Sequence, residues 1–215
     1  MNIPSEEEIG PGNEIIYMTV SPDETRIGVA LGFIVIKDEK EITYIAIYKK
    51  NPKNGDKFEL ENLREFHHQD ACISFYFSMK NNRDLLFFTK QEVFAFNYMD
   101  ASKDTRIVYE LENTLDDYPR FGVFNADQTK FIVTSSMDIL YVDMTKHLEI
   151  DLDDREEVSS IQNIITGDKH FYVLANKKEA RLGYYLFSVS IDDPDEESDY
   201  LINWTNKLDI GNCDL

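Results

Sequence analysis

The feature that most constrains this chain is a unit that recurs four times along it. Each copy consists of an apolar strand, a short polar turn, a second apolar strand, another turn, and a third strand rich in aromatic residues. The predicted first strands cover 15–21, 72–78, 120–125 and 161–166. The second strands cover 26–31, 84–89, 130–135 and 170–175, and the third cover 42–50, 92–100, 138–146 and 183–191. The repeat predicts an all-β chain, which the 12 Tyr and 14 Phe also favour.

The spacing of the repeat indicates the architecture. The predicted first strands end at residues 21, 78, 125 and 166. A unit of three or four antiparallel strands that recurs every 40 to 50 residues is typical of a β-propeller blade. We therefore expect an N-terminal tail over 1–13, four blades over about 14–66, 67–113, 114–157 and 158–200, and a further blade or a tail over 201–215. The segment 49–63 contains Asn-Pro and Asn-Gly pairs and predicts an exposed loop, and 151–157 and 192–199 predict polar connectors.

Three stretches resemble the WD-repeat family. The run from His68 to Ser78 is similar to the opening of a WD repeat, although His67 stands where the family has Gly. The segments 20–24 and 124–136 resemble the family's Phe-Ser-Pro-Asp-Gly turn and the strand after it, and Tyr141-Val142-Asp143 occupies the place of the Trp-Asp pair. The resemblance covers most of 14–191 and implies a propeller that commonly has seven blades. Because four blades leave unpaired strand edges, we expect a fragment of a longer protein or a chain completed by a partner.

Charge narrows the range of partners. The chain has 41 acidic and 22 basic residues, for a formal net charge of -19. Nucleic acid and anionic membranes would be repelled, so neither is an expected partner. The N-terminal MNIPSEEEIGPG lacks the basic start and apolar run of a signal peptide, and Cys72 and Cys213 form no spaced pair. We expect ordinary thiols and a cytoplasmic protein, with the nucleus left open.

No pattern in the sequence predicts a catalytic, cofactor or metal site. The run 151–157 lacks the Gly and Glu of a helix-flanked calcium loop, and 192–199 contains Pro194 but no Gly. His67, His68 and Cys72 cannot all face one ligand set, because adjacent residues of a strand point in opposite directions. Phosphate loops and nucleophile elbows are absent from a sequence that has only 9 Gly.

These patterns favour a non-enzymatic, WD-repeat-like scaffold that mediates protein–protein interaction. Its acidic loops would suit a basic protein partner. Two alternatives stay open. The four blades are the regulatory or targeting propeller of a larger protein, or they belong to a propeller enzyme whose carboxylates or metal line a central channel.

Overall fold

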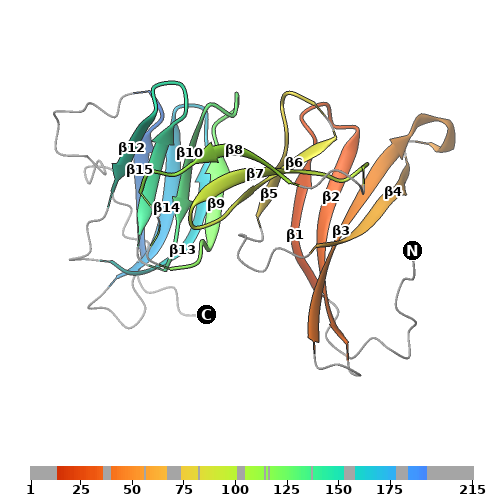
Figure 1. Cartoon of the computed structure of the whole chain (residues 1–215), viewed down its shortest axis with the longest axis horizontal. Coiled ribbons are helices and arrows are strands. Elements are labelled where there is room, and N and C mark those ends of the chain that lie inside the picture. Colours follow the sequence, from red (N-terminus) through yellow and green to blue (C-terminus); the bar gives the residue numbers. More distant parts are fainter. Residues whose placement is uncertain are drawn as a thin grey trace. The chain divides into compact units, whose positions relative to one another are not determined.

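The computed structural model describes residues 14–35, 40–55, 57–66, 74–81, 83–100, 105–113, 115, 117–136, 138–152, 158–177 and 184–192. These residues form fifteen β-strands and one short 3-10 helix, η1 (Pro52–Asn54), and the strands assemble into four separate sheets (Figure 1). In each sheet the hydrogen-bonded neighbours follow one another along the sequence, which is the up-and-down topology of a propeller blade. The predicted fold class, all-β with four propeller-like antiparallel blades, is confirmed.

The first sheet has the order β1-β2-β3-β4 and is antiparallel throughout. Its strands are β1 (Glu14–Val20), β2 (Arg26–Val35), β3 (Lys40–Asn51) and β4 (Lys57–Phe66). The prediction of a loop over 49–63 is therefore wrong. Among the described residues of this segment, those outside the strands are η1 and Gly55, whose φ of 64° is a conformation that glycine adopts without strain. β4 begins at Lys57, and its Phe58, Leu60 and Leu63 supply apolar side chains to the sheet.

In the other three sheets the first three strands follow the predicted repeat, and the second and third sheets each have a fourth strand that was not predicted. The second contains β5 (Phe75–Phe77), β6 (Asp84–Phe88), β7 (Glu92–Asn97) and β8 (Arg106–Glu110). The third contains β9 (Phe121–Phe124), β10 (Lys130–Thr134), β11 (Ile139–Asp143) and β12 (Leu148–Asp151). The fourth contains β13 (Val158–Thr166), β14 (His170–Lys177) and β15 (Tyr184–Ser190). The predicted tails, 1–13 and 201–215, lie outside the described residues.

The chain divides into two compact units. The first comprises residues up to Phe87 together with 94–108, and the second comprises 88–93 and the residues from Tyr109 onward. The first unit has a core built between the first sheet and the strands of the second, in which the aromatic rings of Phe75, Phe87 and Phe94 stack at centroid distances of 5.3 and 5.4 Å. Burying rings of this size removes a large apolar area from water and holds the two sheets together.

The second unit has a core of its own. Phe88 and Phe131 are each within 5.5 Å of Phe124, measured between ring centroids, and all three are almost completely buried. Gly122 lies directly against the Phe88 ring, where an added Cβ would collide with it. Further along, Tyr141 meets Phe171 edge to face. Aromatic residues from the first, second and third strands of the repeat thus supply much of the packing in both units.

Candidate interaction surface

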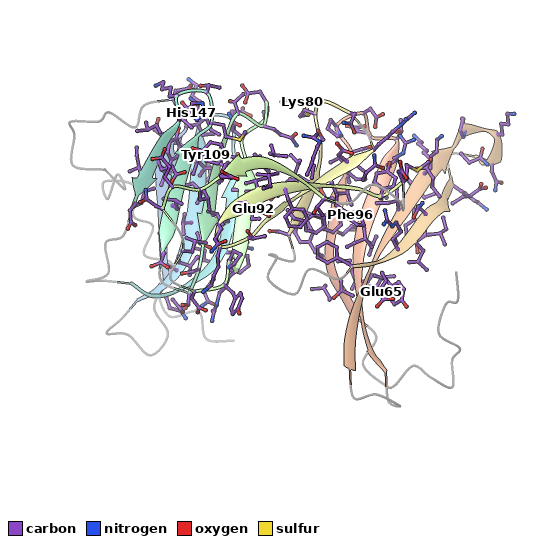
Figure 2. The ribbon with its side chains drawn as sticks, in the orientation of Figure 1. Glu65, Lys80, Glu92, Phe96, Tyr109 and His147 are labelled. Atoms are coloured by element: carbon purple, nitrogen blue, oxygen red, sulfur yellow. The ribbon has the colours of Figure 1, made fainter. Side chains whose placement is uncertain are left out.

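The first sheet has two faces, and both are apolar. One face contributes Ala30, Ile45 and Ile47 to the core of the first unit. On the same side of the sheet, Phe66 and Arg64 lie against Phe96, with ring centroids 5.7 Å apart for the Phe pair and the Arg64 guanidinium carbon 4.6 Å from the Phe96 centroid. We call the opposite side the outer face. Figure 2 labels Glu65, which belongs to the outer face, and Phe96, which packs against the core side.

The strand register arranges the outer face in cross-strand rows. Side chains directly opposite one another in paired strands lie on the same face of a sheet, so each row takes one residue from each strand. The first row is Ile15, Leu31, Tyr44 and Glu65; the second is Met18, Val29, Ala46 and Leu63; the third is Val20, Ile27, Tyr48 and Leu60; a shorter fourth row is Lys50 and Phe58. Within these four rows, Glu65 and Lys50 are the only charged residues, and they stand in the first and last rows.

Much of this apolar face is open to water. Ile15, Met18, Val20, Phe58 and Leu60 are between 40% and 67% exposed, and they lie on the two edge strands, β1 and β4. The centre is better covered, since Val29, Tyr44 and Ala46 are buried. Exposed apolar patches on a protein mark sites of interaction with other proteins or ligands, and here the exposed side chains lie along both edges of one face.

The sequence carried a signal for this surface. A strand with one face in water alternates apolar and polar residues, whereas a strand covered on both faces is apolar almost continuously. The segments Ile27–Leu31 and Tyr44–Tyr48 contain no charged residue and no alternation. They therefore predict a sheet built to be covered on both sides, a feature that the search for individual motifs did not detect.

The ionisation of Tyr44, in the first row of the outer face, is affected by both burial and a neighbouring charge. Burial, followed by the nearby Glu65 carboxylate, raises the pKa of Tyr44 above its ordinary value. Tyr44 accordingly stays neutral at physiological pH and contributes an apolar ring with a hydroxyl at its tip. The third and fourth rows, which contain Tyr48 and Lys50, lie toward the β3–β4 hairpin.

A second polar group lies on the core side of the same sheet. A β-bulge between Ile47 and Tyr48 shifts the register of β4 and places Glu61 beside Arg26, with Arg26 Nε donating to Glu61 Oε2 at 2.8 Å. Both side chains are about five-sixths buried, and the hydrogen bond to Glu61 raises the pKa of Arg26. Burial raises the pKa of the neighbouring Tyr98 to about 12. The Arg26–Glu61 pair therefore links β2 to β4 across β3.

The buried carboxylates of the described residues bond within their own sheets. Asp84 in the second sheet accepts hydrogen bonds from Asn81 Nδ2 and Arg106 at 3.1 and 3.0 Å. Asp143 is fully buried and accepts from the backbone and hydroxyl of Thr145, and its other oxygen lies 3.9 Å from Lys130 Nζ. Each of these two carboxylates links a turn to a strand of its own sheet, so its role is structural.

The positions considered as metal ligands are not tested. His67, His68 and Cys72 lie outside the described residues, as does Cys213. Within the described part of the chain, no group of three or more His, Cys, Asp or Glu is placed to hold a metal ion. Of the acidic runs 151–157 and 192–199, only residues 151, 152 and 192 are described, and Asp192 lies 3.3 Å from Lys130 Nζ. Among the described residues, no helix has the length and apolar character that a membrane span requires.

Comparison with solved structures places the chain among β-propellers. The N-terminal domain of Nup159 is similar over 89% of this chain at 12% sequence identity with a TM-score of 0.50, and this chain spans 45% of that one. At this identity the likeness concerns the fold alone. It agrees with the four blades described above, and this chain spans less than half the length of that relative.

Two further structures show lower similarity. A chain of the mitotic checkpoint complex matches over 84% of this chain at 7% identity with a TM-score of 0.47, and 63% of that chain is covered. A candidate 6-phosphogluconolactonase from Bacteroides uniformis matches over 91% at 11% identity with a TM-score of 0.46, and 70% of that chain is covered. No protein-family model and no curated protein sequence matches this chain.

Proposed function

We propose that this chain is a non-enzymatic, WD-repeat-like propeller module that binds other proteins, and that the outer face of its first sheet is a binding surface. The observation that carries the proposal is the set of exposed apolar side chains in ordered rows on a rigid sheet, with Met18 and Val20 more than half exposed. Surfaces of this type lose unfavourable contact with water when a partner covers them.

The charge of the chain supports a preference among partners. With a formal net charge of -19, the molecule as a whole attracts basic proteins at low ionic strength. The four rows of the outer face itself are mainly apolar. We therefore propose that a basic partner engages the acidic segments, whereas the outer face selects its partner by apolar contact.

A photo-crosslinking experiment tests the proposal. A benzophenone amino acid at position 18 of the full chain places the reactive group on the outer face, and the same group at position 165 serves as the control. Ile165 is 58% exposed, close to the 60% of Met18, but it lies on the fourth sheet. We expect protein adducts from position 18 in cell extract and far fewer from position 165. Equal labelling at the two positions, or no adduct from position 18, would contradict the proposal.

A further inference from the structure

We infer that Lys130 and Tyr141, two residues of the third sheet, form a clasp that holds β15, the end strand of the fourth sheet, in place. The clasp consists of these two side chains and the carbonyl oxygen of Ile191, the residue that directly follows β15. All of these groups belong to the second unit. The inference goes beyond the proposed function, because it concerns how one strand is kept from opening and assigns no partner.

Both donors of the clasp reach the same oxygen. Tyr141 Oη donates to Ile191 O at 3.0 Å, and Lys130 Nζ donates to it at 2.8 Å. A carbonyl oxygen has two lone pairs and can accept both bonds. The two side chains lie on one face of the third sheet, because Lys130 is opposite Asp143 in the register and Tyr141 is two residues before Asp143 on β11. The neighbouring strands β10 and β11 therefore each hold the end of β15.

The clasp is shielded from water. Tyr141 and Ile191 are buried, and the Lys130 side chain is only 14% exposed. A carbonyl group that lost both donors would therefore stay buried without a hydrogen bond, which is costly. Burial, with the nearby Asp143 and Asp192 carboxylates, also raises the pKa of Tyr141, so its hydroxyl keeps the proton that it donates.

Lys130 also balances charge at the clasp. Its ammonium lies 3.3 Å from Asp192 Oδ1 and 3.9 Å from Asp143 Oδ2. Asp143 is fully buried, and its Oδ2 has no hydrogen-bond partner among the described residues. A buried carboxylate is costly without a counter-charge, so Lys130 serves the third sheet as well as the fourth. Asp192 is 81% exposed, and its pair with Lys130 contributes little to stability.

β15 is the strand that such a clasp affects most. In the order β13-β14-β15, its one hydrogen-bonded neighbour among the described strands is β14, and a strand bonded along a single edge opens more easily than a central one. Ile191 N donates to Lys169 O, next to β14, at 2.9 Å. Ile191 is therefore bonded through its N–H to the fourth sheet and through its carbonyl to the third. β15 cannot separate at this end without breaking the clasp, and the acidic segment 192–199 begins at the next residue.

Amide hydrogen exchange of the purified full chain, followed by mass spectrometry of peptides that cover β15, tests the clasp. Tyr141→Phe removes one hydroxyl and keeps the ring that packs against Phe171, so the fold should be retained. We expect exchange in β15 to be about twofold to tenfold faster than in the wild type, the range for the loss of one hydrogen bond. Tyr172→Phe is the matched control. Tyr172 lies on β14 and points to the opposite face of the fourth sheet from Phe171, so this variant should leave exchange in β15 unchanged.

A double variant tests whether the two donors share one acceptor. Tyr141→Phe and Lys130→Met each leave the Ile191 carbonyl one donor, whereas the double variant leaves it none. We therefore expect the increase in β15 exchange in the double variant to exceed the product of the two single increases by at least about threefold. The lost counter-charge of Asp143 is common to both Lys130 variants and cancels. If Lys130→Met does not fold, Asp143→Asn is added to all the variants and to the reference, because it removes the buried charge.

Two results would overturn the inference. One is unchanged exchange of β15 in Tyr141→Phe, or an equal increase in Tyr172→Phe. The other is a pair of single increases that simply multiply in the double variant, which would show that Lys130 and Tyr141 do not act on one carbonyl. The measurements use the purified chain without a partner, so neither result bears on the proposed function, which the crosslinking experiment tests separately.

Discussion

The turns between the first and second strands of the first and third sheets each hold a non-glycine residue in the left-handed conformation. In the first, Asp23 accepts from Ser21 Oγ at 2.6 Å and from Thr25, and Glu24 has a φ of 55°. In the second, Asp127 accepts from the backbone and hydroxyl of Thr129, and Gln128 has a φ of 56°. The turn hydrogen bonds therefore maintain a backbone conformation that costs an L-residue about 1 kcal/mol.

Replacing Gln128 with Gly should stabilise the protein. The left-handed conformation carries little penalty for glycine, and we expect a net gain of about 0.5 kcal/mol after the greater chain entropy of glycine in the unfolded state is subtracted. Urea unfolding measures the change. Gln91→Gly is the matched control, because Gln91 is an exposed turn residue without a positive φ, and it should lower stability. A loss of stability in Gln128→Gly would contradict this account of the turn.

Asp23 should make the protein sensitive to acid. The Ser21 hydroxyl, with help from Thr25, lowers the pKa of Asp23 from 3.8 to about 2. A carboxyl whose pKa is depressed by folding stabilises the folded state above its unfolded pKa, and the contribution disappears as pH falls through the folded pKa. The difference in unfolding free energy between the wild type and Asp23→Asn should therefore be constant above pH 4 and shrink between about pH 4 and pH 2. Urea titrations across that range measure it, and a constant difference down to pH 2 would refute the assignment.

At the level of strands and sheets, most of the fold was predictable because its information is local. Each of the first three strands of a blade is a short apolar run bounded by turn residues, and the segment 125–128 predicted its turn correctly. β4 was not predicted, because the Asn-Pro and Asn-Gly pairs at 51–52 and 54–55 suggested that the loop continued. The outer face has its signal in two whole apolar strands, Ile27–Leu31 and Tyr44–Tyr48, and not in a motif. The bulge near Glu61, which sets the register of β4, has no signature in the sequence.

Loss of the Arg26–Glu61 pair should destabilise the first sheet. The bulge in β4 places the Glu61 carboxylate on Arg26, and Glu61→Gln leaves the largely buried guanidinium without its charged partner. We expect a loss of about 1–3 kcal/mol in unfolding free energy, which is the range for hydrogen bonds to charged groups. Glu110→Gln removes a carboxylate from an exposed position on β8 and should have no measurable effect. Equal stability of the two variants would show that the pair contributes nothing.

At the scale of the whole molecule, charge is unbalanced. The 41 acidic residues outnumber the 22 basic ones, and the ion pairs of the described residues use few of them. Repulsion among like charges acts over about 10 Å at 0.1 M salt and opposes the compact state. Apolar packing in the two units must therefore provide enough stability to offset it.

Added salt should consequently raise the melting temperature. Between about 10 and 200 mM NaCl, screening weakens the net repulsion of a chain of charge -19, and this outweighs the smaller loss of attraction in surface ion pairs. Two variants change the net charge in opposite directions and test the cause. Asp195→Asn with Glu196→Gln and Glu197→Gln should reduce the slope of melting temperature against salt, and Lys53→Gln with Lys57→Gln should increase it. If the slope is negative, or if both variants change it in the same direction, attractive pairs govern the salt response and net repulsion does not.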